Sequence, residues 1–360
     1  MIRPCGFEPR GRGRRRGVYS FFRNTAVRAC YNSAMHYFIV DPYAGLGAGY
    51  STWLRVQKYL IRRHVPYEAY MAENAEQTCE CAKEITARFE KEQRTAAFGE
   101  KAPVEDVIVV VGGDGTLNDV LNGLNIHARF LFTCIPCGPV NDFARGMNLN
   151  LRYKNALRSI LKPRMNTYVD YGTVSARVGS GSSDSAVHRR FAVSCGIGYD
   201  AVIAETASGT QGRRAAARLR LGAPGFFASA VRELIRFRTV PGYIVLDGTK
   251  QISFRHVAFI SCQIHRSENG GFKVAPDADF SDGLFDVCVM ARTSKISMLP
   301  ALASIRAGNH KNMRGVHHYR CHEIKIHFDR PLPVHTDSEI VGNFTDLELT
   351  CNQRQLRVIM

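Results

Sequence analysis

Short hydrophobic runs alternate with amphipathic stretches from residue 35 onward. Four runs have strand character, and each begins a unit of strand followed by helix: 37–40, 67–71, 107–111 and 130–135. The run at 107–111 consists of five consecutive β-branched residues, which is typical of a strand buried on both faces. Strands that alternate with helices predict a parallel sheet with crossover helices. We therefore expect an α/β domain over residues 35–165.

The pattern changes after residue 165 to short strand-like segments separated by Gly, Ser and Asp clusters. This pattern predicts a mostly antiparallel, β-rich second domain over residues 166–343, with a few helices. Strands are expected at 168–174, 190–194, 243–246 and 285–290. The alternation at 323–328 predicts an edge strand whose polar residues face water, and 179–185 has the composition of a surface loop.

Composition narrows the class of protein. The chain has 360 residues, of which 45% are hydrophobic and 22% charged, so it is long enough for two globular domains and is neither disordered nor fibrous. Its longest apolar runs fall short of the roughly 18 residues that a membrane-spanning helix needs, which excludes a transmembrane protein. The 11 cysteines, without an export signal, are expected to be reduced thiols in a cytoplasm.

Two groups of residues have the composition of redox or metal motifs. We interpret both as buried thiols and ordinary strand residues, because neither has the second pair that would complete a zinc site. These groups are Cys134 with Cys137, and His317 and His318 with Cys321 and His322.

The net charge of +16 favours polyanionic partners: nucleotide phosphates, anionic lipid head groups or nucleic acid. Residues 1–34 contain eight Arg and one acidic residue, so they carry +7 of this charge. They are expected to be a disordered basic arm, or else Met35 is the true start of the protein. We expect no specific nucleic-acid partner, because no aromatic-interleaved binding module accompanies the arm.

A glycine-rich segment directly follows the β-branched run. Apolar residues at i, i+3, i+4 and i+7 from Leu117 predict a helix that begins at Thr116. Gly112, Gly113 and Gly115 would let backbone amides approach phosphate oxygens, and the helix N-terminus would add its positive dipole. Asp114 would repel phosphate unless a divalent cation lay between them, which indicates a magnesium nucleotide. The alternative is a tight turn whose glycines only permit the backbone path.

This segment resembles the signature of the diacylglycerol kinase catalytic superfamily, which includes bacterial lipid kinases and sphingosine kinases. The matching residues are Gly-Gly-Asp-Gly-Thr-Leu-Asn at 112–118. NAD kinases share this first motif. The stretch Ile-Pro-Cys-Gly-Pro-Val-Asn-Asp-Phe-Ala-Arg at 135–145 is similar to the lipid-kinase pattern and separates the two groups. Further matches lie at 196–201, 270–276 and 282–284.

The resemblance implies an NAD-kinase-like α/β nucleotide-binding domain, a β-rich lipid-substrate domain and an active site in the cleft between them. It also implies that residues 344–360 return to the first domain. Magnesium and the ATP phosphates would be held by Asp114 and Asp142. The residues implied to line the nucleotide are Asp41, Gly45, Gly112, Gly113, Asp114, Gly115, Thr116, Asn118, Asn141 and Asp142.

The resemblance also implies a second, structural magnesium site near residue 280. Its ligands would be the carbonyl groups of Asp279 and Leu284 and the side chain of Asp282. A solvated turn is the alternative, because Ser and Asp clusters commonly form turns.

Asp337, Ser338 and Glu339 stand where the family carries Asp-Gly-Glu. Phosphoryl transfer to an alcohol needs a carboxylate within reach of the hydroxyl, and a second carboxylate helps to hold metal. Acids at i and i+2 on an extended segment point the same way, so both can face one cleft. We assign Asp337 and Glu339 jointly to the base and metal roles, and which does which stays open. A surface turn with two solvated acids is the alternative.

Several positions depart from the family pattern: Asp41 for Asn, Pro139-Val140 for Thr-Gly, Ser338 for Gly, and Ala72 near a usual Thr. Pro139 removes an amide donor and a hydroxyl, and Asp41 adds negative charge beside phosphate. Because Asp114, Asn118, Asp142 and Glu339 are present, an active kinase with altered nucleotide contacts is favoured.

The expected activity is ATP-dependent phosphorylation of a lipid hydroxyl, with diacylglycerol converted to phosphatidic acid. A catalytically impaired lipid or nucleotide sensor and an NAD kinase are the alternatives. Such an enzyme would be cytoplasmic, docked on the inner face of the membrane, and a homodimer is compatible with the sequence. The expected docking surface mixes basic and apolar residues, although a solvated helix with an apolar inner side is the alternative. Its residues are Arg213, Arg214, Arg218, Arg220, Arg232, Arg236 and Arg238 around Leu219, Leu221, Phe226, Phe227, Leu234, Ile235 and Phe237.

Overall fold

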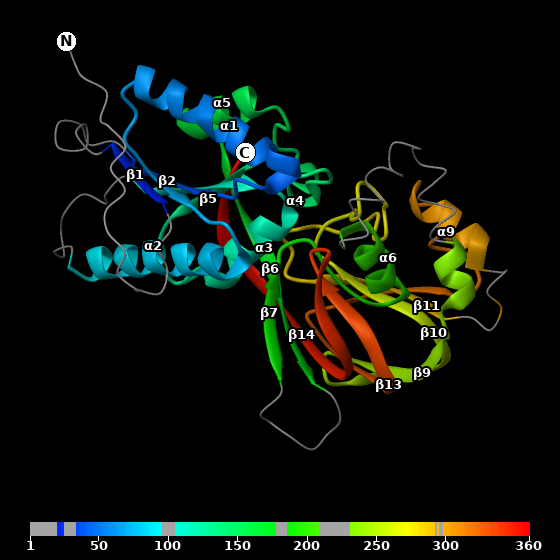
Figure 1. The fold of residues 1–360 in the computed structure, drawn as a ribbon. Helices are drawn as coiled ribbons and strands as arrows, with labels where there is room; N and C mark the ends of the chain where they lie inside the picture. The colour runs from blue at the N-terminus through cyan, green and yellow to red at the C-terminus, as the bar shows by residue number, and fades with distance from the viewer. Residues whose placement is uncertain are drawn as a thin grey trace, which may run out of the picture.

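The chain folds into two lobes that share one long C-terminal strand (Figure 1). The structure is a computed structural model, and it describes residues 20–24, 34–95, 105–177, 186–208, 231–291, 294 and 298–360. The main path of hydrogen-bonded strands runs β1-β3-β2-β4-β5 in the first lobe and continues as β14-β13-β8-β10-β11-β12 into the second. The predicted surface loop at 179–185 lies outside the described residues.

The first lobe is the predicted α/β domain. Its parallel sheet is built from β3 (Tyr67–Met71), β2 (His36–Val40), β4 (Val107–Gly112) and β5 (Leu131–Pro136). Helices cover both faces, which explains the nearly continuous apolar strands. One face carries α1 (Ala44–Arg62) and α5 (Tyr153–Leu161), and the other carries α2 (Ala75–Thr95) and α3 (Asp114–Gly123).

Five residues of the expected disordered arm are ordered. Residues Ser20–Asn24 form β1, which pairs antiparallel with β3 from Ser20 opposite Met71 to Asn24 opposite Tyr67. The expectation of disorder is therefore wrong for this segment, because the outer edge of β3 offers unpaired backbone groups to any extended chain nearby. Residues 1–19 and 25–33 lie outside the described residues.

The second lobe is the predicted antiparallel domain. Its strands are β6 (Asn166–Arg177), β7 (Val187–Phe191), β8 (Ser194–Gly198), β9 (Val240–Leu246), β10 (Lys250–Gln263), β11 (Phe285–Ala291), β12 (Val316–Cys321), β13 (Glu323–Thr336) and β14 (Glu339–Ile359). Alternate residues of these strands fill one core, and a smaller core lies beneath α6 (Tyr199–Ser208) and α9 (Leu299–Ile305).

Two expectations about these strands are wrong. The segment 323–328 belongs to β13, which pairs with β14 on one side and β9 on the other, so it is an interior strand. Alternation reports the two faces of a strand and carries no information about its edges. The segment 190–194 is not one strand either: β7 ends at Phe191 and β8 begins at Ser194.

β14 ties the two lobes together. Val358 pairs in parallel with Phe132 of β5, and the Thr133 hydroxyl donates to the carbonyl of Ile359 at 3.3 Å. The β13–β14 hairpin turns at Asp337 and Ser338, between the paired residues Thr336 and Glu339. The C-terminal strand therefore carries this hairpin as well as the pairing with β5.

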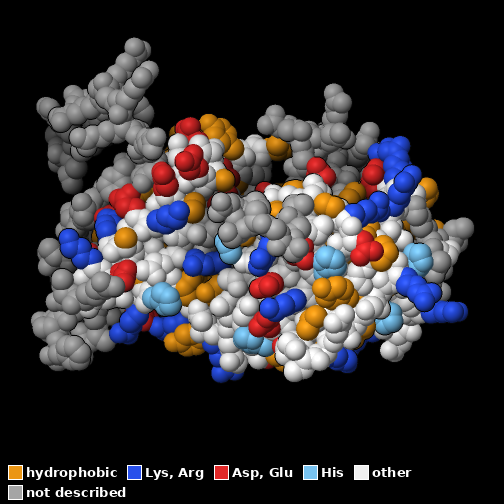
Figure 2. All heavy atoms as spheres, turned by 90° about the horizontal axis from the view of Figure 1, so that it is seen from below, with side chains coloured by type: hydrophobic (Ala, Val, Ile, Leu, Met, Phe, Trp, Pro, Cys, Tyr) orange, Lys and Arg blue, Asp and Glu red, His pale blue; other side chains and the backbone are white. Residues whose placement is uncertain are grey.

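The described surface gives no sign of a membrane span. Among the described helices, none combines enough length with enough apolar character to cross a bilayer. On the face shown in Figure 2, hydrophobic side chains occur in small groups between basic, acidic and histidine side chains.

Candidate active site

A cleft of about 860 Å³ is lined by residues of both lobes, from Asp41 to Glu339 in the sequence. Eight of the predicted site residues line it: Asp41, Gly45, Gly113, Asp114, Gly115, Thr116, Asp337 and Glu339. Four others are not part of the lining: Gly112, Asn118, Asn141 and Asp142. The three residues predicted for a second magnesium site, Asp279, Asp282 and Leu284, do not line it either.

The glycine-rich turn passes unusually close to a second loop. α3 begins at Asp114, two residues before the predicted start, and the Leu117 amide donates to the Gly113 carbonyl at 3.0 Å. A Cβ atom added to Gly138 would lie 2.8 Å from the Gly113 Cα atom. Only glycines allow this backbone contact. The first turn of α3, with its unpaired amides, therefore faces the cleft beside the 138–141 loop.

The departure at Asp41 has a local structural role. Its Oδ1 atom accepts from the amides of Tyr43 and Ala44 at 2.9 and 3.1 Å, at the start of α1. Its Oδ2 atom accepts the hydroxyl hydrogen of Thr116 at 2.8 Å. Asp41 thus links the end of β2 to the first turn of α3, and three donors offset the negative charge it brings to the cleft.

Asn141 and Pro139 shape the second loop. Asn141 has a left-handed backbone conformation with φ 59° and ψ 53°. Its side-chain amide both accepts from the Gly138 amide at 3.0 Å and donates to the Gly138 carbonyl at 2.6 Å. Asn141 therefore holds the loop rather than facing the cleft, whereas Pro139 and Val140 line the cleft directly.

Asp114 lines the cleft, and Asp142, which is buried outside that lining, interacts with Asp114 electrostatically. Asp114 Oδ1 accepts from the Phe143 amide at 3.3 Å, at the start of α4 (Asp142–Gly146), and Asp142 Oδ1 accepts from the Gly270 amide at 3.0 Å. Burial raises the pKa of Asp114 to about 6. Burial, and then the charge of Asp114, raise the pKa of Asp142 to about 7. Two carboxylates that repel each other supply the hard oxygen donors that Mg²⁺ prefers, so this pair fits a magnesium ion.

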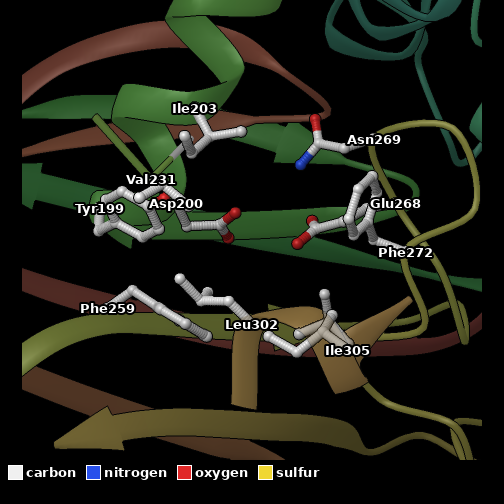
Figure 3. A pocket seen from close by; sticks show the side chains of 11 residues that line it. Tyr199, Asp200, Ile203, Val231, Phe259, Glu268, Asn269, Phe272, Leu302 and Ile305 are labelled. Carbon is white, nitrogen blue, oxygen red and sulfur yellow. The ribbon is translucent and has the colours of Figure 1, made fainter. Parts of the chain in front are cut away.

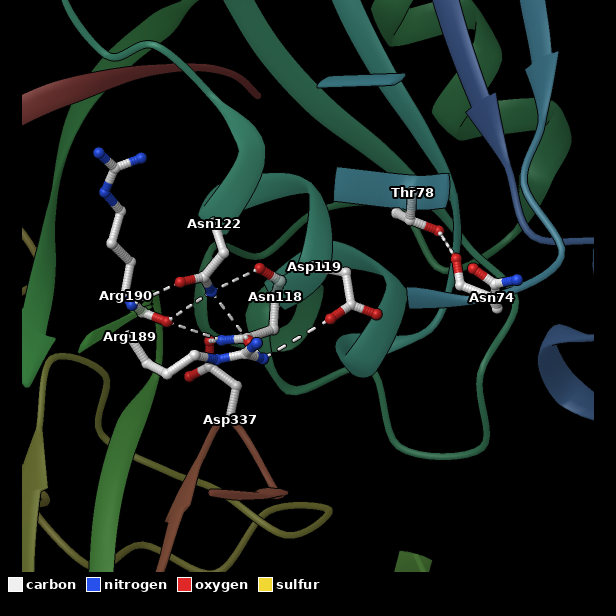
Figure 4. A network of polar contacts seen from close by, with 8 residues as sticks. All are labelled: Asn74, Thr78, Asn118, Asp119, Asn122, Arg189, Arg190 and Asp337. Atoms are coloured by element: carbon white, nitrogen blue, oxygen red, sulfur yellow. Dashed lines mark hydrogen bonds and ion pairs between the residues drawn. The ribbon is translucent and has the colours of Figure 1, made fainter. Parts of the chain in front are cut away.

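Asp337 is buried at the tip of the hairpin and is saturated with donors, of which Figure 4 shows Asn118. Its Oδ2 atom accepts from Asn118 Nδ2 at 2.9 Å and from the Ala192 amide at 2.8 Å. Its Oδ1 atom accepts from the amides of Val193 and Ser194 at 2.8 and 3.0 Å. These amides are turned toward Asp337 where β7 gives way to β8, which explains why the predicted strand at 190–194 is interrupted.

Glu339 differs from Asp337 although only one residue separates them. Glu339 is an exposed residue. Its side chain lies against the glycine-rich turn, because a Cβ atom added to Gly115 would collide with Glu339 Oε1. Across the described part of the chain we find no hydrogen bond to the Glu339 carboxylate. The protein atoms around the carboxylate displace water from it and so raise its pKa, and the positive charge of Arg189 opposes that shift. Glu339 therefore presents an uncommitted carboxylate to the mouth of the glycine-rich turn.

The turn residue Ser338 stands where the family has glycine. Asp337 and Ser338 both adopt left-handed backbone conformations, with φ values of 48° and 69°. A two-residue hairpin turn of this hand usually takes Asn or Asp followed by Gly. The Ser338 hydroxyl donates to Asn269 Oδ1 at 3.3 Å, so the hairpin tip contacts the loop that also holds Asp142 through Gly270.

Several residues of the site have no individual signal in the sequence. Arg189 Nη2 donates to Asn118 Oδ1 at 2.7 Å and lies 3.6 Å from Asp119 Oδ1 (Figure 4). Arg306 lines the cleft from the end of α9, with its guanidinium 5.7 Å from the centre of the Phe272 ring. Arg145 also lines the cleft, and its place three residues after Asp142 in the second motif was the one available clue.

The predicted second magnesium site is a turn held by hydrogen bonds. Asp279 Oδ1 accepts from the amide and hydroxyl of Ser281 at 3.0 and 2.8 Å. Asp282 Oδ1 accepts from the Leu284 amide at 3.0 Å, and Arg320 donates to its Oδ2 atom. A guanidinium therefore already offsets the charge of Asp282, and magnesium binding by Asp279, Asp282 and Leu284 stays a prediction.

The CxxC pair does not form a paired thiol site. Cys134 is buried in β5, whereas Cys137 is partly exposed and its thiol donates to the Ile135 carbonyl at 3.4 Å. Both cysteines are free thiols, as predicted.

Comparison with known proteins identifies the family. Residues 35–174 match the diacylglycerol kinase catalytic domain, and residues 193–360 match the YegS C-terminal NAD kinase beta sandwich-like domain. Residues 35–174 therefore belong to the diacylglycerol kinase catalytic-domain family, and the two matches together span most of the chain. The family supports a kinase phosphotransferase of the lipid-kinase type, with ATP as co-substrate.

The relatives are distant but cover most of the chain. The candidate lipid kinase YtlR of Bacillus subtilis is 26% identical over 325 residues, which are 89% of this chain and 98% of YtlR. The diacylglycerol kinase of Mycobacterium tuberculosis is 28% identical over 244 residues, covering 63% of this chain and 72% of that enzyme. The crystal structure of a candidate diacylglycerol kinase from Bacillus anthracis has a TM-score of 0.69 at 20% identity, over 94% and 98% of the two chains. This structural likeness concerns the fold.

Proposed function

We propose that the protein transfers the γ-phosphoryl group of ATP to a hydroxyl group of a membrane lipid, with diacylglycerol as the substrate. One observation carries the proposal: the uncommitted carboxylate of Glu339 lies against Gly115, at the mouth of a glycine-rich turn. A base beside a phosphate-binding turn is the arrangement that phosphoryl transfer to an alcohol requires.

Glu339 is the proposed general base. Its carboxylate accepts the proton of the lipid hydroxyl as the hydroxyl oxygen bonds to the γ-phosphorus. The bond between the γ-phosphorus and the β,γ-bridging oxygen breaks, and ADP leaves with that oxygen. Asp337 is the proposed positioning residue, since four donors occupy its oxygens and leave none for a substrate proton. In this proposal Glu339 takes the role of base and Asp337 does not, an assignment that the sequence alone left open.

The nucleotide is proposed to lie along the first turn of α3. The amides of that turn and of the 138–141 loop would bind phosphate oxygens, and Arg145 and Arg306 line the same cleft with positive charge. Asp114 and Asp142 would hold Mg²⁺, which when bound neutralises charge on the β- and γ-phosphates. The raised pKa values of Asp114 and Asp142, about 6 and about 7, support a site that binds a cation.

An apolar pocket next to the cleft is the proposed site of the lipid. It has a volume of about 70 Å³ and shares Asn269 and Phe272 with the cleft. Phe259, Leu302 and Ile305 form one side of it, and the carboxylates of Asp200 and Glu268 point toward each other across it (Figure 3). Hydrocarbon of the substrate would contact the apolar side of this pocket.

Docking on an anionic membrane surface is part of the proposal, because an acyl-chain substrate resides in a bilayer. Residues 213–227 of the predicted docking surface lie outside the described residues. The remaining part is helical at 231–236, where Leu234 is buried and Ile235 is 63% exposed. Arg232 and Arg236 flank Ile235 and share the carboxylate of Glu233, at 3.1 and 3.8 Å.

The decisive experiment is turnover of γ-labelled ATP, with magnesium, against diacylglycerol, sphingosine and NAD. Label in phosphatidic acid is expected. Label in NADP would replace the proposal with an NAD kinase, and label in another lipid would replace only the substrate. No transfer by protein that still binds ATP and lipid vesicles would support the sensor.

A further inference from the structure

Three side chains of types that commonly bind metals converge in the second lobe, and none of them lines the proposed kinase cleft. Cys288 is on β11, His318 is on β12, and His310 follows α9. The thiol and one ring nitrogen of each histidine lie within 4.8 Å of one another. The geometry points to a zinc site formed by Cys288, His310 and His318, and we propose that it binds Zn²⁺ with one position left for water.

The strand register fixes two of the three ligands. Cys288 and His318 stand directly opposite each other on the antiparallel pair β11–β12. Directly opposed residues on one sheet face have the closest side chains in a sheet. Cys288 belongs to the small core under α9. His318 therefore faces that core too, while its neighbour His317 points to the other face and lies near Phe254 and Tyr319.

The third ligand is oriented by a backbone hydrogen bond. His310 is fully buried, and its Nε2 atom lies 3.0 Å from the Val274 carbonyl. An Nε2–H donor to this carbonyl leaves the lone pair on Nδ1, which has no hydrogen-bond partner among the described residues. Metal-binding histidines are usually held in this way, with the second nitrogen donating to a carbonyl or carboxylate.

His318, like His310, has a ring nitrogen that is buried without a hydrogen-bond partner among the described residues. In His318 this nitrogen is Nε2. Burial lowers the pKa of His318 to about 4, and it lowers that of His310 as well. A metal-binding imidazole uses the lone pair of a ring nitrogen that makes no other hydrogen bond, and within the described part of the chain the His310 Nδ1 and His318 Nε2 atoms are of this kind. The charge of Lys311, next to His310, is offset by an ion pair with Asp277.

One thiolate and two imidazoles are a borderline-soft donor set, which favours zinc over magnesium. Tetrahedral zinc has bonds of about 2.0–2.3 Å and so holds its ligand atoms roughly 3.3–3.8 Å apart. Because the three donor atoms already lie within 4.8 Å of one another, closure by at most about 1.0–1.5 Å reaches that spacing. Binding converts the Cys288 thiol to a thiolate, and its proton passes to solvent. His318 is only partly buried, which gives the ion a route from solvent.

The proposed ion would fix α9 to the sheet. His310 lies five residues beyond Ile305, the last residue of α9, and Leu302 and Ile305 line the apolar pocket. A bond from the metal to His310 would hold this helix against β11 and β12. This consequence for the pocket rests on the proposed function, whereas the metal site itself does not.

Cobalt is the probe for this site. Full-length protein is dialysed against a chelator and titrated with Co²⁺ without magnesium, while visible and near-ultraviolet absorption is recorded. One Co²⁺ per chain with a thiolate-to-cobalt band is expected, and Zn²⁺ should displace it. A carboxylate site such as Asp114 and Asp142 gives no thiolate band, so failure of the kinase proposal would not affect this result.

Four variants test the assignment. Cys288→Ser is expected to abolish the thiolate band, and His318→Gln to weaken Co²⁺ binding by at least about tenfold. Cys321→Ser and His317→Gln change the same residue types on the opposite face of β12. These two variants should leave the thiolate band and the affinity for Co²⁺ unchanged. Zn²⁺ should raise the melting temperature of the wild type and both controls only. If Cys288→Ser does not fold, Cys288→Ala replaces it. A wild type without the band, or a Cys288 variant that keeps it, overturns the site.

Discussion

The side chain of Asn118 donates a hydrogen bond of 2.9 Å to Asp337, although the two residues are 219 positions apart in the sequence. Asn118 is in the second turn of the helix that follows the glycine-rich turn, and Asp337 is at the tip of the C-terminal hairpin. The bond fixes the hairpin against that helix. Glu339, two residues later, is thereby held in front of Gly115.

The Glu339→Gln variant should lose activity while remaining stable. Glutamine keeps the shape of glutamate but cannot take the substrate proton, so kcat should fall roughly 10²- to 10⁴-fold. The melting temperature should stay close to that of the wild type, because the described residues give the carboxylate no hydrogen bond to lose. Steady-state kinetics and thermal unfolding check both parts. Wild-type turnover in this variant would remove Glu339 from the mechanism.

The Asp337→Asn variant should instead lose stability. An asparagine amide would place its NH₂ group against backbone amides of 192–194 that now donate to a carboxylate. Leaving buried donors unpaired costs about 1–3 kcal/mol, or more beside a charge. Urea unfolding measures this loss, with Glu339→Gln as the matched control. Equal stability of the two variants would contradict the positioning role of Asp337.

Stability should depend on pH through the carboxylates of Asp114 and Asp142. Burial raises the pKa values of Asp114 and Asp142 from the ordinary 3.8 of an aspartate to about 6 and about 7. Between the unfolded pKa of 3.8 and the folded values of about 6 and about 7, the folded chain holds more protons than the unfolded chain. The free energy of unfolding therefore falls as pH rises through this window. The slope is at most about 1.4 kcal/mol per pH unit for each proton lost.

Urea unfolding from about pH 5 to about pH 8, without divalent cations, measures this slope. Asp142→Asn should flatten it, and so should saturating Mg²⁺. Asp277→Asn is the control, because Asp277 is an exposed residue outside the cleft and Lys311 holds its pKa below the usual range. A slope that Asp142→Asn leaves unchanged would show that the pair does not titrate as described.

Local pattern predicted the four parallel strands of the first lobe to within one residue at each end. The strand expected at 67–71 is β3, and the β-branched run at 107–111 is β4 with Gly112 added. These strands are buried on both faces, so burial and β-branching leave a direct mark on the sequence. For the second lobe, the sequence predicted the class of domain but not the order of its strands. The alternation of residues in an antiparallel strand indicates which face is buried, but it does not indicate which strands pair with it.

The sequence indicated those site residues that lie together in one motif. It did not indicate residues that come from separate parts of the chain and meet only in the folded structure. Asp114 and Gly115 belong to one motif, and both line the cleft. Arg189 and Arg306 reach the same region from β7 and the end of α9, with no local pattern around them. The difference between Asp337 and Glu339 depends on the amides at 192–194, which only the tertiary structure brings to Asp337.

Restoring the usual residue at position 139 should strengthen ATP binding. Pro139 lines the cleft without an amide N–H, and the family pattern has Thr there. A hydrogen bond to a charged group contributes about 1.5–3 kcal/mol, so Pro139→Thr should lower the KM for ATP about tenfold. Pro139→Ala restores the amide alone and should give a smaller decrease. The KM for lipid should not change, and an unaltered KM for ATP in both variants would contradict this account.

Membrane docking should depend on Ile235 and on salt. Ile235 is 63% exposed between Arg232 and Arg236, so it can enter a bilayer surface while the arginines contact anionic head groups. Burying an isoleucine side chain contributes about 1.5–3 kcal/mol, so Ile235→Asp should weaken binding to phosphatidylserine vesicles roughly tenfold or more. Leu151→Asp is the control, since Leu151 is 41% exposed but lies in the first lobe. Vesicle co-sedimentation at low and high salt measures both effects. Binding that is indifferent to salt and to Ile235→Asp would place the docking surface elsewhere.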